Sequence, residues 1–311
     1  MIEHYSVMKD EVISMLDIKP DGIYVDGTLG RGGHTTEILK KIKNGHVYAF
    51  DLDVQAINKC ESSLVNYSDK ITYIHDNFAN FKVRLAELGV NKIDGLLLDL
   101  GVSSPQFDQP ERGFSYRYDA PLDMRMNQEQ EISAYDVVNT YEFNELNKIF
   151  GLYGEEKYCK QIARKIEQYR MNKPIETTFE LVDVIKSALP SKVLNKKGHP
   201  CKKSFQAIRI EVNHELESLN RVLEGLNEVI EINGTVVIIT FHSLEDRIVK
   251  DCFKEMCKSI DLNKDLKMLP NNFIESDFKP IAKKVLIASD KELLENSRSS
   301  SAKLRGIRRV K

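Results

Sequence analysis

The chain has 311 residues, 41% of them apolar and 30% charged, with a formal net charge of −2 at pH 7. Such a composition describes a soluble chain that can bury a sizeable core in one large domain or in two. The near-neutral charge excludes a protein that is basic throughout. Any site for a polyanion such as a nucleic acid must therefore be local.

The sequence carries no evident targeting, membrane or metal-binding signal. The five cysteines are scattered, and the closest two, Cys252 and Cys257, have no partners at zinc-finger spacing, so we expect neither a metal site nor disulfides. Residues 1–6 lack a basic region followed by an apolar core, and no run approaches the roughly 20 apolar residues that span a bilayer. We therefore expect a cytoplasmic protein without a membrane partner.

Short apolar runs with β-branched residues predict four buried parallel strands in the first third of the chain, at residues 23–26, 47–51, 71–75 and 95–99. The segments between these strands are amphipathic. Ile38, Leu39 and Ile42 fall on one helical face, and residues 80–88 carry a similar apolar stripe. Strands and helices in alternation predict an α/β fold with a doubly wound, Rossmann-like sheet.

The alternation stops after Asp99. About a hundred residues follow without a convincing strand, but with helical patterns such as residues 155–170 and a capping-box spacing at residues 177–180. A helix with apolar positions from Leu216 to Ile230 and a strand at residues 235–240 then resume the pattern. We predict a discontinuous sheet domain, 1–107 and 208–311, interrupted by a mainly helical insertion, 108–207.

A glycine-rich segment, DGTLGRGGH at residues 26–34, joins the first predicted strand to the first predicted helix. Glycines there let the backbone turn sharply and approach a ligand, while the helix offers unpaired N–H groups. The spacing is neither a dinucleotide fingerprint nor a P-loop. Asp26 would oppose a pyrophosphate but attract an ammonium group, which favours the amino-acid end of S-adenosylmethionine over a dinucleotide.

Two further candidate ligand contacts lie at or just after the ends of the next two predicted strands. Asp51 is placed to accept hydrogen bonds from both hydroxyls of a ribose. Phe78, just after the third strand, offers an apolar or stacking wall for an adenine. Because ligands of open α/β sheets bind at the carboxyl ends of the strands, these residues together predict one crevice for the cofactor.

Asp99 ends the fourth predicted strand and should face the same crevice. The exocyclic amine of a nucleobase is a poor nucleophile because its lone pair is delocalised into the ring. A carboxylate that accepts hydrogens of the amine would hold it for in-line attack on a sulfonium methyl group, and positioning supplies much of the acceleration. Asp99 is thus a candidate catalytic acceptor or base, and contact with the cofactor is the alternative.

Several long strings resemble those of the ribosomal RNA small subunit methyltransferase H family, the cytosine-N4 methyltransferases of 16S ribosomal RNA. The match runs nearly end to end, with the strings in the right order. They are residues 26–34, 97–106 (LLDLGVSSPQ), 111–115 (ERGFS), 121–126 (PLDMRM), 154–156 (GEE), 204–213 (SFQAIRIEVN), 241–250 (FHSLEDRIVK) and 296–300 (NSRSS).

The resemblance implies a class I S-adenosylmethionine-dependent methyltransferase fold and N4-methylation of a specific cytidine in the decoding region of 16S RNA. The partner would be small-subunit ribosomal RNA or the 30S subunit, recognised by the helical insertion, and the oligomeric state stays open. In the family the methyl donor is held at positions that match Gly32, Gly33, His34, Asp51, Phe78, Asp99 and Gln106, all of which are present.

Two local basic segments suit an RNA partner. Residues 191–210 carry six cations and no carboxylate, and so do residues 298–311. We therefore predict phosphate contacts there, which would position the RNA without reading its sequence, with Lys202, Lys203 and Arg209 as candidates.

Three further features bear on the substrate. His242 follows the strand at residues 235–240, so it should face the crevice as a substrate contact or as a structural histidine. Asp123 and Arg125 are expected to form a salt bridge in a loop, with contact to a base or a phosphate as the alternative. Residues 199–204 read HPCKKS, with lysines where similar proteins have arginines, so a bidentate phosphate contact would be lost there.

Three other functions share some of these features. A dinucleotide-dependent oxidoreductase would use the same fold, but with a pyrophosphate-cradling glycine loop and without Asp26 beside it. A ribosome-assembly factor that only binds RNA would need no complete donor pocket. A DNA amino-methyltransferase would use Asp99 in nearly the same way, and only the family resemblance decides for RNA.

Overall fold

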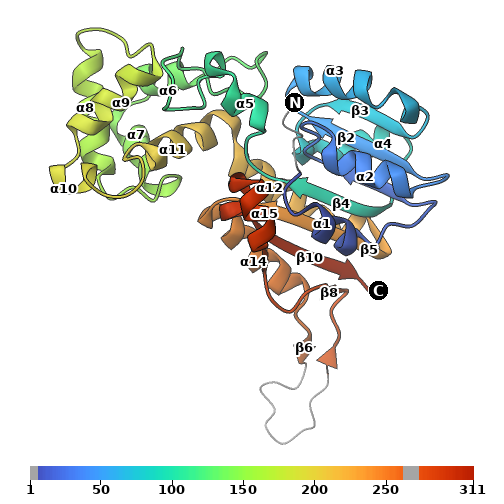
Figure 1. The fold of residues 1–311 in the computed structure, drawn as a ribbon. Helices are drawn as coiled ribbons and strands as arrows, with labels where there is room; N and C mark the ends of the chain where they lie inside the picture. Colours follow the sequence, from blue (N-terminus) through green and yellow to red (C-terminus); the bar gives the residue numbers. More distant parts are fainter. Residues whose placement is uncertain (1–5, 262–272) are drawn as a thin grey trace, which may run out of the picture. The chain divides into compact units, whose positions relative to one another are not determined.

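The computed structural model describes residues 6–261 and 273–311 (Figure 1). The first five residues, which entered the expectation that no export signal is present, lie outside the described part. The chain divides into a sheet unit, Met1–Gly101 with Glu217–Lys311, and a helical unit, Val102–Leu216. Among the described residues, no helix is long and apolar enough to cross a membrane.

The sheet unit is built on eight strands, counted over the described residues, in the order β3-β2-β1-β4-β5-β10-β8, with β9 beside β10 (Figure 1). The first five in this order run parallel, and the last three are antiparallel to their neighbours. The strands are β1 Ile23–Asp26, β2 His46–Asp51, β3 Ile71–His75, β4 Ile93–Asp99, β5 Ile230–Thr240, β8 Phe278–Pro280, β9 Leu286–Ile287 and β10 Lys303–Arg309; β6 Ile260–Asp261 and β7 Phe273–Ile274 pair separately.

Helices cover both faces of this sheet because successive strand residues point to opposite sides. Tyr24 and Leu97 face a core shared with α1, α2 and α3, whereas Val25 and Leu96 face a core shared with α4, α12 and α14. The helices of this unit are α1 Lys9–Leu16, α2 Gly33–Lys41, α3 Val54–Ser63, α4 Phe81–Glu87, α12 Glu215–Glu224, α13 Leu226–Val229, α14 Ser243–Met256 and α15 Asp290–Glu295. The predicted doubly wound sheet is confirmed.

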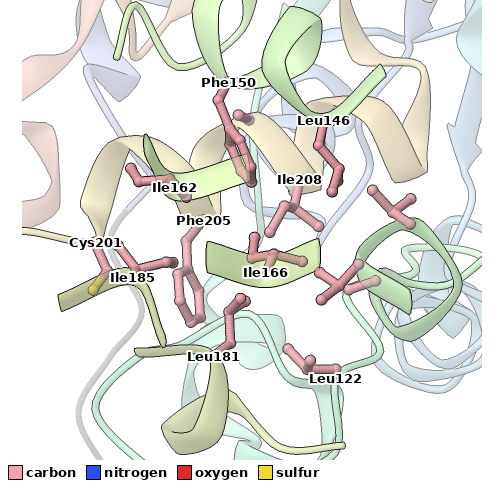
Figure 2. Close-up of a cluster of buried hydrophobic side chains, with 14 of the residues drawn as sticks. Leu122, Leu146, Phe150, Ile162, Ile166, Leu181, Ile185, Cys201, Phe205 and Ile208 are labelled. Atoms are coloured by element: carbon pink, nitrogen blue, oxygen red, sulfur yellow. The ribbon is translucent and has the colours of Figure 1, made fainter. Parts of the chain in front are cut away.

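The helical unit has its own core, in which Phe150, Ile166, Leu181 and Phe205 are turned toward one another (Figure 2). Its helices are α5 Ser104–Asp108, α6 Ala134–Thr140, α7 Phe143–Leu152, α8 Cys159–Arg170, α9 Thr178–Ser187, α10 Ser191–Leu194 and α11 Lys202–Asn213; short 3-10 turns lie at Val65–Tyr67, Phe78–Asn80, Pro110–Arg112 and Ser297–Ser301. The predicted capping box opens α9, where Thr177 and Glu180 bond each other's backbone. The mainly helical character of the insertion is confirmed.

The structure corrects two predicted helices. The helix expected to run from Leu216 to Ile230 is interrupted at Gly225, a poor helix former, and Ile230 already begins β5. The helix expected from residue 155 begins at Cys159, because Glu155 has a φ of 47°, outside the right-handed helical region.

The unit boundaries also differ from the predicted ones at 107/108 and 207/208. The helical unit extends to Leu216 because α11 buries Phe205, Ile208 and Val212 in the helical core. At the other end it begins at Val102, which packs against the same core.

Candidate active site at the carboxyl edge of the sheet

Three of the predicted carboxylates end adjacent parallel strands. Asp26 ends β1, which lies between β2, ended by Asp51, and β4, ended by Asp99. The register pairs Asp26 with Ala49 on one side and with Leu97 on the other, two residues before each neighbouring carboxylate. The prediction that the three side chains share one edge of the sheet is confirmed.

The glycine-rich loop is tied to all three strands by hydrogen bonds. The Gly30 amide donates to Asp51 Oδ2 at 2.7 Å, and the Asp99 amide donates to Thr28 Oγ1 at 2.7 Å. Asp26 accepts from the Thr28 amide at 3.1 Å and from the Thr35 hydroxyl at 2.6 Å. The ends of β1, β2 and β4 therefore fix the loop in one shape.

Glycine is required in this loop for two different reasons. Gly32 caps α2 with a φ of 72°, in the left-handed region that side chains disfavour. At Gly27 the φ is ordinary, but an added Cβ would overlap Leu98 Cδ2 and lie 3.0 Å from Phe78 Cβ. The backbone at Gly27 thus passes too close to neighbouring residues to carry a side chain.

Asp51 is a carboxylate whose pKa is shifted toward neutrality. Burial raises the pKa of Asp51 to about 6, although hydrogen bonds from the Asp53 and Gly30 amides oppose the shift. At neutral pH the group is ionised and keeps lone pairs for further donors. This is the state that two ribose hydroxyls would require.

Asp26 is almost fully buried, and burial raises its pKa while the Thr35 hydroxyl lowers it. Each of its oxygens already accepts one hydrogen bond from the loop or from α2. Its first role in the structure is therefore to shape the loop. Thr28 and Thr35, which donate the hydrogen bonds to Asp26, were not among the predicted site residues, although both lie within the motif or next to it.

His34 and Asp99 contain buried polar atoms that lack partners. Within residues 6–261 and 273–311, neither ring nitrogen of His34 has a hydrogen-bond partner, and neither does Asp99 Oδ1. His34 is only 6% exposed, and its Nε2 lies 3.6 Å from Asp99 Oδ2. Because buried polar groups are nearly always paired, this cluster is typical of a ligand-binding site.

Phe78 lies in the sheet unit, whereas Gln106 lies in the helical unit. Phe78 opens a 3-10 turn after β3 and lies beside Gly27, and its contact with an adenine stays a prediction. Gln106 belongs to the helical unit, where it is buried and its Oε1 accepts from the Ser103 amide at 2.9 Å in the capping box of α5. Its contact with the cofactor stays a prediction.

His242 follows β5, as predicted, and it caps α14. Its Nδ1 accepts from the Glu245 amide at 3.4 Å, and its Nε2 lies 3.1 Å from Glu245 Oε1. These contacts give the residue a structural role. A contact with substrate stays a prediction.

The predicted phosphate-binding residues of the helical unit differ in their availability. Lys202 is exposed at the start of α11, but Lys203 donates to the Glu155 carbonyl at 2.7 Å. Arg209 forms two hydrogen bonds of 2.8 Å with Glu215 and is 15% exposed. Of the three, Lys202 is the best placed to meet a phosphate.

The basic segment at the carboxyl end is largely used inside the sheet unit. Lys303 and Arg305 donate to Asp246 at 2.9 and 2.8 Å, and Arg308 donates to Asp17 at 2.9 Å. Arg309 donates to the backbone oxygens of Asn227, Ile230 and Lys311. These cations stabilise β10. Fewer of them are therefore available for phosphate contacts than the composition of this segment indicated.

The loop pair of Asp123 and Arg125 is confirmed as a salt bridge. Arg125 donates to Asp123 at 2.7 Å through Nη2 and at 3.1 Å through Nε. Both side chains are partly buried.

A Rossmann-like sheet with a glycine-rich loop and acidic strand ends at its carboxyl edge defines the class I methyltransferase fold. The chain belongs to the MraW methylase family, whose family model matches residues 1–310. It is therefore a methyltransferase.

The chain is also similar to individual proteins. The chain is 52% identical to the ribosomal RNA small subunit methyltransferase H of Streptococcus dysgalactiae subsp. equisimilis, over 99% of this chain and 98% of the relative. Among solved structures, a rRNA methylase from Streptococcus thermophilus aligns with a TM-score of 0.41 and 12% identity over 97% of this chain and 94% of the other. Fibrillarin from Aeropyrum pernix, in complex with S-adenosyl-L-methionine, aligns with a TM-score of 0.39 and 9% identity, over 94% of this chain and 68% of the fibrillarin chain.

Proposed function

We propose that this methyltransferase transfers the methyl group of S-adenosylmethionine to N4 of a specific cytidine in the decoding region of 16S ribosomal RNA. Family membership and 52% identity to a ribosomal RNA small subunit methyltransferase H support the reaction class and the RNA substrate. The motifs that resemble those of the family support the choice of base. The single observation that carries the chemistry is the unpartnered, buried Oδ1 of Asp99 at the carboxyl edge of the sheet.

The residues at this edge fit the methyl donor. Asp26 would attract its ammonium group, Asp51 would accept from its ribose hydroxyls, and Phe78 would cover its adenine. Gly32, Gly33 and His34 would line the approach to the donor, and the ring nitrogens of His34, which have no hydrogen-bond partner among the described residues, suit its polar atoms. When bound, S-adenosylmethionine supplies a methyl group on a positively charged sulfur.

Asp99 would orient the nucleophile. Its Oδ1 would accept a hydrogen bond from the cytosine amine and hold the nitrogen in line with the methyl carbon. As the new N–C bond forms, the C–S bond breaks and its electron pair stays on sulfur; the amine proton then leaves to solvent. The carboxylate also stabilises the positive charge that develops on nitrogen.

The helical unit would recognise the RNA, either as naked 16S RNA or within the 30S subunit. Exposed lysines such as Lys192, Lys196, Lys197 and Lys202 would contact phosphates. An RNA of this kind would place the protein in the cytoplasm.

Methyl transfer from radiolabelled S-adenosylmethionine tests the proposal. The acceptors are small ribosomal subunits, naked 16S RNA and DNA from cells that lack this protein, each followed by nucleoside analysis. We expect label in N4-methylcytidine from the ribosomal acceptors and none from DNA. Binding to subunits without methyl transfer would make the protein an assembly factor, and label in DNA alone would make it a DNA methyltransferase.

The role of Asp99 is tested by Asp99→Asn, with Asp94→Asn at the opposite end of β4 as the control. Loss of the carboxylate should lower kcat by about a hundredfold, in the range of a positioned acid–base group, and leave the dissociation constant of the donor unchanged. The control should leave both constants unchanged. Weaker donor binding at normal kcat would instead make Asp99 a cofactor contact.

A further inference from the structure

Three aromatic rings of the helical unit form a layered stack. Phe205 is buried in the helical core and meets Tyr116 edge-on, with 5.6 Å between ring centroids and an interplanar angle of 90°. Tyr116 in turn lies flat against His199, with centroids 4.1 Å apart and an angle of 10°. Tyr116 and His199 are both partly exposed. The stack thus leads from the core to the surface and ends in the imidazole of His199.

The His199 ring is held uncharged and in a fixed orientation. Burial lowers the pKa of His199, and the positive charges of Lys186 and Arg117 lower it further. Its Nδ1 accepts a hydrogen bond from the Cys201 amide at 3.3 Å, so the proton of the neutral ring lies on Nε2. A flat, neutral ring with one N–H donor offers both a face and an edge for recognising a nucleobase.

The surroundings of this stack are cationic. Lys186 and Arg117 lie close enough to act on His199, and the Lys202 amide donates to the His199 carbonyl at 3.1 Å. Within the described ranges, none of these three side chains has an ion-pair partner, in contrast to Arg209. Among the residues that the structure describes, no side chain caps the amino terminus of α11 beside them, and the positive dipole end of the helix favours an anion.

We infer that His199, backed by Tyr116 and flanked by Arg117, Lys186 and Lys202, is a stacking platform for an unpaired base of the substrate RNA. Single-stranded RNA is bound in this way, with a base on an aromatic ring and the adjoining phosphates on cations. The inference rests on the proposed function and adds to it a contact site distinct from the donor crevice of the sheet unit. Nothing in the arrangement reads base identity beyond the one Nε2–H donor.

The test compares three variants in the full-length protein. His199→Ala removes the exposed ring, His199→Phe restores a ring without the imidazole nitrogens, and Lys59→Gln on α3 removes an unrelated exposed cation as a control. The measurements are the dissociation constant for naked 16S RNA, KM and kcat for methyl transfer to it, and the dissociation constant for S-adenosylmethionine. Thermal unfolding shows whether each variant is folded.

Loss of the ring should raise the RNA dissociation constant and KM by about tenfold, the effect of one base–aromatic stack, with kcat and donor binding unchanged. His199→Phe should recover most of the affinity, and Lys59→Gln should match the unaltered protein. The inference is overturned if His199→Ala binds RNA normally, or if His199→Phe is as impaired as His199→Ala. If the unaltered protein does not methylate RNA, the proposed function is refuted. The inference about the stack is still tested in that case, because RNA binding is measured independently of methyl transfer.

Discussion

Asp51, the proposed acceptor for the ribose hydroxyls, should make donor binding depend on pH. With its pKa raised to about 6 by burial, Asp51 is ionised at pH 7 and becomes protonated as the pH falls through 6. A protonated carboxyl loses an acceptor for the ribose hydroxyls, so the dissociation constant of S-adenosylmethionine should rise by up to about tenfold per pH unit below that pKa. Calorimetric titration between pH 5 and 7 measures the effect. Asp51→Asn should bind weakly at every pH, and a flat profile for the unaltered protein would contradict the assignment.

Asp246 has the opposite electrostatic character. Burial raises its pKa, but hydrogen bonds from Arg305 and Lys303 outweigh burial and lower the pKa below the ordinary value. The stability that these bonds contribute is therefore present above about pH 4, the ordinary value, and is lost as the pH falls through the lowered pKa. At pH 7, Asp246→Ala should lower the free energy of unfolding by about 1–3 kcal/mol, because it leaves partly buried cations without their acceptor.

Urea unfolding measures this loss. Asp251→Ala, at an exposed position on the same helix, is the control and should change the stability by less than about 0.5 kcal/mol. Below pH 3 the difference between Asp246→Ala and the unaltered protein should shrink. Equal losses at pH 7 and at low pH would show that packing, and not the ion pairs, is responsible.

The glycine loop is the element most sensitive to small substitutions. Gly27→Ala would press a methyl group against the buried Leu98 and against Phe78, and should lower the free energy of unfolding by about 1–3 kcal/mol. Donor binding should weaken as well, since the loop shifts. Gly151→Ala is the matched control, because its Cβ would meet only Cys159 Sγ at an ordinary 3.8 Å. It lies in α7, where alanine should stabilise by about 0.5–1 kcal/mol. Chemical denaturation measures the stability of both variants, and calorimetry measures their donor binding. A Gly27→Ala variant with unchanged stability would contradict the close packing.

Local patterns predicted the elements that carry the donor site, but not the carboxyl-terminal part of the sheet. The strands β1 to β4 are short, mainly apolar runs ending in a carboxylate or a histidine, so sequence alone marked both the strands and the ends where the candidate site lies. By contrast, β10 reads KLRGIRR and resembles a basic surface segment. Two of its cations, Lys303 and Arg305, pair with Asp246, more than fifty residues earlier, and no local pattern reveals such a partner.

Site roles that depend on three-dimensional pairing were equally hidden. The sequence indicated Asp26 as an ammonium contact, but its bond to the Thr35 hydroxyl shows that it also shapes the loop. Lys203 and Arg209 looked as available as Lys202 until their bonds to Glu155 and Glu215 were seen. Conversely, the stack of Tyr116 on His199 joins residues more than eighty positions apart.

At the scale of the whole molecule, the two units have separate hydrophobic cores, so a ligand can stabilise one without the other. S-adenosylmethionine at a hundred times its dissociation constant should add about 2.7 kcal/mol to the stability of the unit that binds it. Hydrogen exchange should slow at the amides of β1, β2 and β4 and stay unchanged in α7, α8 and α9. Equal protection of both cores would show that the donor stabilises the helical unit as strongly as the sheet unit, which a contact with Gln106 alone would not explain. Asp51→Asn, with weakened binding, should show little protection in either.

The discontinuous sheet unit has a consequence for synthesis on the ribosome. The helical unit is one continuous stretch and can fold as soon as it emerges, whereas β4 must wait for its neighbour β5, which begins about 130 residues further along, and β5 must wait for β10. At a translation rate of roughly 5–20 residues per second, the edge of β4 that β5 covers stays unpaired for about 7 seconds or longer. Chaperones that bind exposed strands therefore have a defined interval in which to protect the nascent protein.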